Sequence, residues 1–330
     1  MEKSFDYYSN VKTGTVKWLW YPYIPYGKLT ILQGDPGEGK SSFIIDVIAR
    51  LSRGDVMPDG SGSKEVQPAI YQCAEDGLAD TVKPRFEKAG ADCSKIAYIV
   101  DSDASLNLDD ASIEETIVRI GARLLVVDPL QAFIPPDADL TNVSRMRSVL
   151  RRIAGIAERY ECAIVLVGHM NKKGSGKSLY RGLGSIDIAA IARSILMVVR
   201  NPEKPGIRYL IPIKSSLAQE GKTLSFSFDD KGKLVWDAVD EGNDIDNDLD
   251  DEVLLSFTKK DLAKQYLISL LEETPVPSTE VFDRLRTEGI QKRTANLAKK
   301  ELGVIAYKVG KRWWWKLPDD VSLEEDDSDE

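Results

Sequence analysis

The first regular pattern of hydrophobic positions is a short apolar run over residues 29–32, which is followed by a polar, glycine-rich stretch. Apolar residues then return at helical spacing, with Phe43, Val47 and Leu51 four positions apart. This spacing places the apolar side chains on one face of a helix. The pattern therefore predicts a buried strand, a tight turn and an amphipathic helix in direct succession.

The same alternation continues along the chain, because short apolar runs predict strands and segments with apolar positions three or four residues apart predict helices. The predicted strands are 69–74, 96–100, 123–128, 163–167, 194–200, 209–214 and 224–229. The predicted helices are 81–90, 111–121, 142–160 and 186–193. Strands that alternate with helices indicate an α/β protein with a mainly parallel sheet.

The turn after the first strand reads Gly34-x-x-x-x-Gly39-Lys40-Ser41, which is a P-loop in its proper context of strand, glycine loop and helix. Its backbone N–H groups would converge on phosphate oxygens at the positive end of the helix. Lys40 would reach the β- and γ-phosphates, and Ser41 would ligate Mg²⁺. The cofactors expected are therefore ATP and Mg²⁺. The expected ATP-binding residues are Gly34, Asp35, Pro36, Gly37, Glu38, Gly39, Lys40, Ser41 and Ser42.

Two acidic residues follow predicted strands. Asp128 ends a buried apolar strand about 90 residues after the P-loop, and this position is typical of a Walker B aspartate that holds Mg²⁺ together with Ser41. Pro129 follows it, so a catalytic base must come from another strand. Glu75 is the candidate, since ligands bind at the carboxyl ends of such strands. The alternative is that Glu75 or Asp76 caps the next helix.

The strand 163–167 leads into His169 and then into a glycine-rich loop, 171–184. At this strand end a polar group would face the γ-phosphate, so His169 is predicted to sense it. A hydrogen-bonded structural histidine is the alternative. The loop carries cations that suit a grip on single-stranded DNA, although a solvated surface loop is also possible. These cations are Lys172, Lys173, Lys177 and Arg181.

Six sequence blocks resemble the RecA-like ATPases of the RepA type, which are ring-forming hexameric replicative helicases of plasmids with relatives in phages and integrated elements. The blocks begin at Gly34, Ala74, Leu125, Gly168, Arg181 and Ile213, within residues 18–236. The resemblance implies a homo-oligomer, a water-activating role for Glu75 and a γ-phosphate sensor at His169. It also implies a cation, placed at Lys214, that reaches the neighbouring subunit's nucleotide. Lys214-Ser-Ser lacks the family's arginine, so Arg193 or Arg208 could take that role instead.

The net charge of −9 hides an uneven distribution, because acidic and basic residues are concentrated in different segments of the chain. Acidic residues dominate 237–256 and 319–330, which are expected to be a linker and a disordered tail. The three cysteines form no Cys-x-x-Cys pair and His169 is the single histidine, so a thiolate or histidine-rich zinc site is excluded. No apolar run is long enough for a membrane span. We therefore expect a cytoplasmic protein.

The segment 257–318 is basic, with 13 lysines and arginines against 7 acidic residues. Helices over 260–271, 279–286 and 291–302, followed by a hairpin over 305–317, predict a winged-helix DNA-binding domain. Protein binding or ring closure is the alternative for this domain, with the Trp313–Trp315 run as its core. The expected DNA contacts, to a duplex, are Gln291, Lys292, Arg293, Asn296, Lys299, Lys300, Lys311 and Arg312.

The predicted domain order is a RecA-like ATPase core over 1–236, the acidic linker, the winged helix and the acidic tail. The core begins with an aromatic segment, 18–26, that forms either a hydrophobic lid or an adenine platform. Together these features predict an ATP-hydrolysing, hexameric DNA motor that tracks single strands, a helicase of a mobile element. The alternatives are an ATP-switched DNA-binding or loading protein, and a signalling or defence ATPase that uses its ring as a scaffold.

Overall fold

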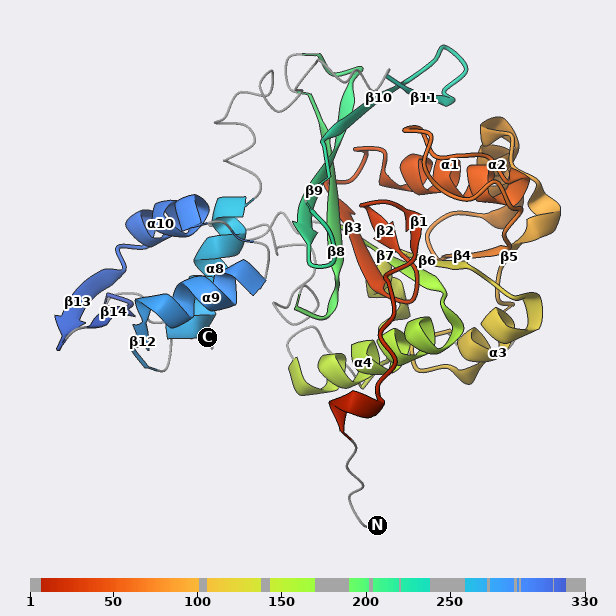
Figure 1. Ribbon diagram of the computed structural model, residues 1–330. Coiled ribbons are helices and arrows are strands. Elements are labelled where there is room, and N and C mark those ends of the chain that lie inside the picture. Colours follow the sequence, from red (N-terminus) through yellow and green to blue (C-terminus); the bar gives the residue numbers. More distant parts are fainter. Residues whose placement is uncertain are drawn as a thin grey trace, which may run out of the picture.

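The computed structural model describes residues 7–100, 106–137, 143–169, 190–201, 204–219, 221–237, 259–271, 274–287, 290, 292–310 and 312–318. Within these residues lie a large sheet with helices on both of its faces, and a smaller unit of three helices and three short strands (Figure 1). The acidic linker and tail lie outside the described residues, apart from Asp237.

The large sheet has nine described strands, six of which are parallel. Their order across the sheet is β11 (Leu234–Trp236), β10 (Leu224–Phe228), β9 (Arg208–Ser215), β8 (Ser194–Arg200), β3 (Leu29–Gly34), β7 (Ala163–His169), β6 (Leu124–Asp128), β4 (Ala69–Cys73) and β5 (Ile96–Ala97). Strands β8 to β5 in this order run parallel, and β9, β10 and β11 continue the sheet antiparallel. The predicted α/β class with a mainly parallel sheet is confirmed.

Helices cover both faces of this sheet (Figure 1). One face carries α1 (Lys40–Arg53) and α2 (Lys83–Ala89), and the other carries α3 (Ala111–Ile120) and α4 (Val143–Tyr160). Successive strand residues point to opposite faces, so Leu32 belongs to the core with α1 while Ile31 belongs to the core with α4. Burial on both faces explains why the parallel strands are apolar at almost every position.

Four short helical turns lie among the described residues, and one of them forms the first part of a predicted helix. They are η1 (Tyr8–Asn10), η2 (Leu78–Val82), η3 (Cys93–Lys95) and η4 (Leu130–Phe133). The predicted helix 81–90 is divided between the π-helical turn η2 and the α-helix α2, with Pro84 in the first turn of α2. Proline lacks an N–H and fits only the first turn of a helix, which sets where α2 begins.

The predicted strand 96–100 is only two residues long, and a side chain explains the difference. The Gln72 amide on β4 donates to the Ile99 carbonyl oxygen at 3.4 Å and accepts from the Ile99 N–H at 2.9 Å. The backbone of Ile99 therefore bonds to a side chain instead of continuing the strand ladder. The helix predicted over 186–193 is described only from residue 190, and there it ends before Ala192.

The aromatic segment forms a small hairpin of β1 (Trp18–Trp20) and β2 (Ile24–Pro25). Trp20 is fully buried, and its ring lies 6.1 Å from that of Phe43 on α1 and 5.6 Å from that of Trp236 on β11. A ring enclosed in this way cannot stack on a base, so the interpretation as a hydrophobic lid is confirmed for Trp20. Strand β11, which the sequence pattern did not predict, supplies the opposite side of this aromatic cluster.

The C-terminal unit contains α8 (Lys259–Leu271), β12 (Val276–Pro277), α9 (Ser278–Thr287), α10 (Lys292–Glu301), β13 (Ile305–Val309) and β14 (Arg312–Lys316). The three predicted helices and the hairpin are present, and β12 adds a third antiparallel strand beside β14. Trp315 is buried with Val281 and Leu285, whereas Trp313 is 53% exposed. Among the described helices, none is long and apolar enough to cross a membrane.

Candidate nucleotide site

The P-loop joins β3 to α1 and depends on its glycines. Gly37 and Gly39 have φ angles of 82° and 101°, a region that side chains with a Cβ rarely adopt. A Cβ atom on Gly34 would lie 2.3 Å from the carbonyl oxygen of Val198 on the neighbouring strand β8. The loop therefore needs glycine for backbone conformation at two positions and for close strand contact at the third.

Lys40 begins α1 and is only 4% exposed. Its Nζ atom donates hydrogen bonds to the carbonyl oxygens of Gly34 (2.7 Å) and Asp35 (2.9 Å). Burial lowers the pKa of Lys40, while the charges of nearby carboxylates act to raise it. These carboxylates belong to Asp128, Asp35, Glu38 and Glu75. The predicted lysine thus lies among the acidic groups that the sequence assigned to the same site.

Asp128, at the end of β6, is 4% exposed and accepts a hydrogen bond of 2.8 Å from the hydroxyl of Tyr71 on β4. Burial and the Asp128 charge raise the pKa of Tyr71, so the phenol stays protonated and donates. The hydroxyl of Ser41 and the carboxylate of Asp128 are hard oxygen ligands that fit Mg²⁺. No cluster of three or more metal-binding side chains occurs among the described residues, so Mg²⁺ bound here would rely on phosphate oxygens and water for its other ligands.

Glu75 follows β4, the strand that pairs directly with β6. Cys73 lies opposite Asp128 in the register, and the Ala74 N–H donates to the Asp128 carbonyl oxygen at 3.2 Å. The exposed Glu75 side chain therefore extends from the same sheet edge as Asp128. The Asp76 carboxylate instead accepts a hydrogen bond of 2.5 Å from Arg85 on α2, and the residue directly before η2 is Gly77, which has no side chain. Both the role of Glu75 as a base and the capping alternative stay predictions.

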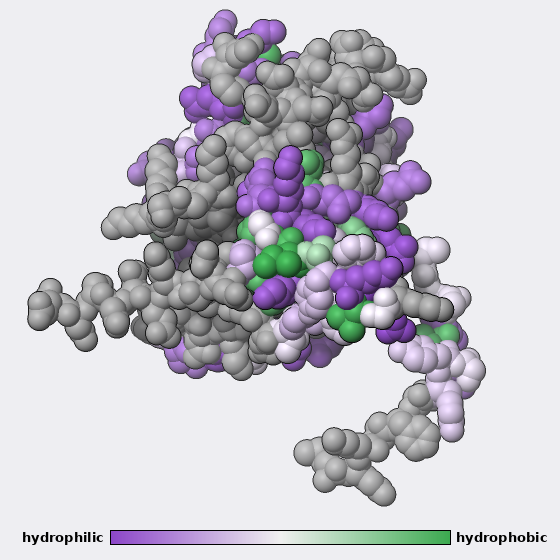
Figure 2. Space-filling view, turned by 90° about the vertical axis from the view of Figure 1, so that its left-hand side faces the viewer, coloured by the Kyte–Doolittle hydropathy of each residue, from purple (hydrophilic) through white to green (hydrophobic). Residues whose placement is uncertain are grey.

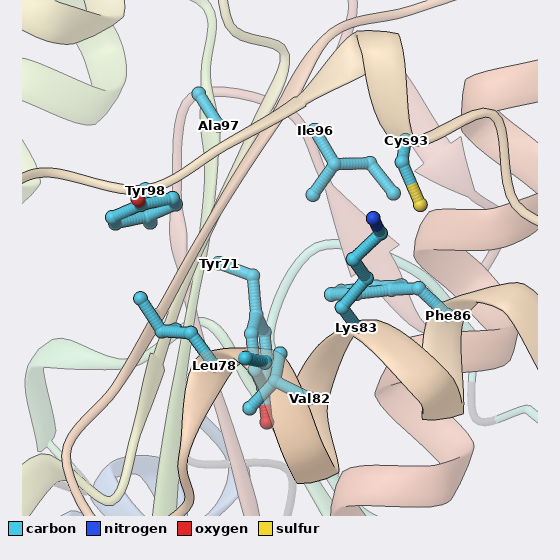
Figure 3. Close-up of a pocket in the computed structure, with 10 residues that line it drawn as sticks. Tyr71, Leu78, Val82, Lys83, Phe86, Cys93, Ile96, Ala97 and Tyr98 are labelled. Atoms are coloured by element: carbon cyan, nitrogen blue, oxygen red, sulfur yellow. The ribbon is translucent and has the colours of Figure 1, made fainter.

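Tyr71 also lines an apolar pocket of about 290 Å³ between β4, β5 and the η2–α2 segment (Figure 3). Its other lining residues are Leu78, Ala79, Val82, Lys83, Phe86, Cys93, Ile96, Ala97 and Tyr98. No P-loop residue and no acidic residue contributes to the lining. The pocket is therefore separate from the phosphate-binding loop, and Tyr71 lies at the boundary between them.

The predicted sensor and DNA loop are described only in part. The backbone of His169 pairs with that of Gly34, so residue 169 lies beside the first glycine of the P-loop. The His169 side chain and the cations Lys172, Lys173, Lys177 and Arg181 lie outside the described residues. The sensor and strand-gripping roles stay predictions.

The three candidates for the trans-acting cation differ in placement. Lys214 is 2% exposed and pairs with Ile195, toward the end of the sheet opposite the P-loop. Arg208 lies at the P-loop end of the same strand β9, where its Cδ atom would be 3.2 Å from a Cβ on Gly39 of its own chain. Arg193 is exposed at the opposite end. A cation that reaches a neighbour must be accessible, so exposed Arg193 fits this role better than buried Lys214 or half-buried Arg208.

Sequence reasoning missed Tyr71 and Arg200. Tyr71 reaches Asp128 only because β4 pairs with β6, and nothing local in the sequence indicates that pairing. Arg200 ends the predicted strand 194–200, and its Nη2 atom donates to the Gly37 carbonyl oxygen at 3.0 Å. A cation at the carboxyl end of a strand in an α/β sheet was a usable signal for Arg200.

The predicted DNA contacts of the C-terminal unit lie mainly on α10. Lys292, Asn296 and Lys300 are exposed on it, and Arg312 is exposed at the start of β14. The Nζ atoms of Lys292 and Lys299 lie 5.0 Å and 4.5 Å from the ring centres of Phe282 and Trp315. Figure 2 shows hydrophilic residues around a few hydrophobic ones on the face turned toward the viewer. Gln291, Lys311 and the Arg293 side chain lie outside the described residues.

Curated proteins similar to this chain include the DNA repair protein RadA of Mycobacterium tuberculosis (strain CDC 1551 / Oshkosh), 29% identical over 153 residues, and that of Streptococcus pneumoniae (strain ATCC BAA-255 / R6), 28% identical over 151 residues. Each match covers 45% of this chain but only 28% and 31% of the relative. This chain thus spans less than a third of their length. Among solved structures, a KaiC-like protein of Pyrococcus horikoshii OT3 gives a TM-score of 0.46 at 20% identity, covering 65% of this chain and 91% of that one.

The match to a protein family covers more of the chain. The sequence model of the AAA domain family matches residues 4–175 of the 330, which is more than half. That stretch contains the P-loop, Glu75, Asp128 and His169, the residues whose strands meet at one edge of the sheet. The chain belongs to the AAA domain family.

Proposed function

We propose that this protein hydrolyses ATP and uses the energy to move along single-stranded DNA as a ring-forming motor, a helicase of the replicative type in a mobile element. The observation that carries the ATPase part is the convergence of Lys40, Asp128 and Glu75 at the ends of β3, β6 and β4. Such a set combines phosphate binding, metal binding and a base in one site.

Each residue of this set has a distinct task in the proposed reaction. Lys40 and the N–H groups of the P-loop hold the phosphates, while Ser41 and Asp128 hold Mg²⁺, which supplies charge neutralisation when bound. The hydroxyl of Tyr71 keeps the Asp128 carboxylate in place through its 2.8 Å hydrogen bond. Glu75 orients the attacking water and accepts its proton. His169 reports the state of the γ-phosphate to the loop that follows it.

The proposal includes assembly into a ring, with six subunits as the expected number. In a ring of one repeated contact, each subunit presents one surface to the site of the next. Arg193 is the trans-acting candidate that the burial pattern favours, because it is exposed while Lys214 is 2% exposed. The guanidinium of Arg193 would neutralise phosphate charge in the neighbouring site.

The DNA part of the proposal is based on the C-terminal unit and on the similar proteins. The C-terminal unit has the order helix, strand, two helices and a hairpin that a winged helix requires, and α10 exposes Lys292, Asn296 and Lys300. The similar RadA proteins are named for DNA repair. We propose that α10 binds duplex DNA, and that Lys172, Lys173, Lys177 and Arg181 contact a single strand.

The second candidate function is an ATP-switched protein that loads onto DNA or regulates at a site without moving along it. The separate basic unit favours it, because a winged helix alone suffices for site binding. Both candidates share the ATPase chemistry of the core. They differ in whether single-stranded DNA changes the rate of hydrolysis.

Steady-state ATP hydrolysis, measured alone, with single-stranded DNA and with duplex DNA, tests the proposal. A motor should show strong stimulation by single strands, and Lys172→Ala combined with Lys173→Ala should remove this stimulation but keep basal turnover. The matched control is Lys64→Ala with Lys95→Ala, which removes two exposed cations of the core. Stimulation by duplex only, or by neither, would reject the motor in favour of the switch.

A further inference from the structure

The end of β8 and the start of β9 lie against the P-loop of the same chain. A Cβ atom on Gly34 would meet the Val198 carbonyl oxygen of β8, and Arg200 donates to the Gly37 carbonyl oxygen. Arg208 and Arg200 are opposite each other in the antiparallel register of these two strands. Two guanidinium groups are therefore placed next to the phosphate-binding loop. Their strands β8 and β9 lie on the opposite side of β3 from β6 and β4, the strands that carry Asp128 and precede Glu75 (Figure 1).

Arg208 reaches the last glycine of the loop. A Cβ on Gly39 would lie 3.4 Å from its Nε atom and 3.4 Å from Cζ of Phe228 on β10. The guanidinium carbon lies 4.5 Å from the centre of the Phe228 ring, and Nη1 donates to the Gly206 carbonyl oxygen at 3.1 Å. The side chain is thus held in one place, by a ring on one side and by a backbone carbonyl at its end.

One donor of this fixed group lacks a partner. The Nε atom of Arg208 is buried and has no hydrogen-bond acceptor among the described residues. Burial and the charge of Arg200 lower the pKa of Arg208, and the carboxylate of Glu38 opposes this shift without a hydrogen bond to Nε. A buried N–H without an acceptor is costly, and two adjacent guanidinium groups favour an anion between or beside them.

We propose that Arg208 binds a phosphate group of the nucleotide in its own subunit. A phosphate oxygen is the acceptor that the unpaired Nε–H lacks, and the planar guanidinium matches phosphate geometry. Its place beside Gly39, directly before the phosphate-binding Lys40, puts it at the loop that receives the phosphates. This inference rests on nucleotide binding by the P-loop and is independent of the proposed movement on DNA. It removes Arg208 from the candidates for the trans-acting cation.

A purely structural role makes a different prediction. If Arg208 only supports the P-loop through its aliphatic part and the Phe228 ring, then any side chain of similar length should do the same. Arg208→Met keeps the unbranched apolar part of the side chain up to about the position of Nε but has no N–H group, whereas Arg208→Lys keeps the charge without the planar fork. Arg119 on α3 is exposed and distant from the P-loop in the fold, so Arg119→Ala is the matched control for loss of one arginine.

The experiment is equilibrium binding of ATP to the full chain, together with the melting temperature of the protein without nucleotide. We expect Arg208→Ala and Arg208→Met to weaken ATP binding by about 10- to 100-fold, as loss of a charge-assisted hydrogen bond would. Arg208→Lys should recover part of the affinity. The melting temperature without nucleotide should shift by less than about 2 °C in Arg208→Met, and Arg119→Ala should bind ATP normally.

Two results would overturn the inference. One is unchanged ATP affinity in Arg208→Ala, and the other is full affinity in Arg208→Met, which would make Arg208 a structural support. Failure of the wild-type chain to bind ATP would instead reject the nucleotide site itself, together with everything that rests on it. The two proposals can also fail separately. If Arg208→Met loses ATP binding, the inference about Arg208 is supported. If DNA does not change the rate of ATP hydrolysis by the wild type, only the proposed motor is rejected.

Discussion

Two groups of cations in this chain differ in how they are held. Around the P-loop, Lys40 is buried on two backbone carbonyls and Arg208 lies between an aromatic ring and a carbonyl. On the C-terminal unit, Lys292 and Lys300 are exposed, and the Nζ atom of Lys292 lies over the face of Phe282. The first group has fixed positions and has lost much of its hydration. The lysines of the second group remain hydrated and can change their side-chain conformation.

The difference indicates two kinds of recognition. A fixed, partly desolvated cation gains most from one ligand of matching geometry, because the local dielectric is low and no side-chain ordering remains to be done. An exposed cation gains mainly by releasing counterions from a polyanion, which is independent of exact geometry and sensitive to salt. Single substitutions in the core should therefore change ATP binding or hydrolysis strongly. Single substitutions in the C-terminal unit should change DNA affinity weakly, and the change should depend on salt concentration.

The largest effect is expected in the core, from Glu75→Gln. The amide has the shape of the carboxylate but cannot accept the proton of the attacking water, so turnover should fall about 100- to 10,000-fold. ATP affinity should stay close to that of the wild type, since Glu75 is assigned to water and not to phosphate. Single-turnover hydrolysis and equilibrium binding measure the two quantities.

Glu115→Gln is the control for this change, because Glu115 is an exposed carboxylate on α3. It should leave both turnover and affinity unchanged. Turnover near the wild-type rate in Glu75→Gln would show that the base is another group.

A smaller, salt-dependent effect is expected from Lys292→Ala combined with Lys300→Ala on the C-terminal unit. If each lysine contacts one phosphate, the slope of log affinity against log salt should become shallower by about 0.9 for each. Fluorescence anisotropy with a labelled duplex at several salt concentrations measures this slope. ATP hydrolysis without DNA should not change.

The variant with Lys64→Ala and Lys95→Ala serves again as the control, since it removes the same charge from the core. If the slope of log affinity against log salt becomes equally shallow in both double variants, DNA affinity depends only on the net charge of the protein. In that case α10 makes no specific contact with DNA.

Tyr71→Phe should have a modest effect that sharpens the description of the core. The substitution removes the 2.8 Å hydrogen bond to Asp128 but keeps the ring and its edge contact with Phe86. Loss of one such bond is worth about 1 kcal/mol, so the Mg²⁺ concentration for half-maximal hydrolysis should rise about fivefold. A magnesium titration of the hydrolysis rate measures this.

Tyr160→Phe is the matched control. The hydroxyl of Tyr160 donates a hydrogen bond of 2.8 Å to Glu114, and this pair lies far from the P-loop in the fold. An identical magnesium dependence in Tyr71→Phe and the wild type would show that the phenol does not position the metal ligand.

The smallest effect is expected from Gly303→Ala, at the end of α10. Gly303 has a φ angle of 64°, and a Cβ there would find only Pro318 Cγ at 3.7 Å, so space is available but the conformation is unfavourable. The C-terminal unit should lose about 1 kcal/mol of stability. Chemical denaturation followed by tryptophan fluorescence measures it, and unchanged stability would show that α10 ends differently in solution.

Much of the core could be predicted because its signals are local. The run into Gly34 and the spacing of Phe43, Val47 and Leu51 already define a strand, a loop and a helix, and the structure confirms all three. Prediction was wrong where a distant side chain competes with the backbone. The Gln72 amide takes the hydrogen bonds of Ile99 and ends β5 early.

The sequence alone determined the P-loop, the acidic residues at strand ends and the separation of a basic C-terminal segment, because each is a pattern within a few consecutive residues. Only the tertiary structure decided which strands are neighbours. That order places the Tyr71 hydroxyl within hydrogen-bond distance of Asp128. It also places Arg208 and Arg200 beside the P-loop of the same chain and buries Lys214. Strand order depends on how all helices and strands pack together, and no local spacing of residues records it.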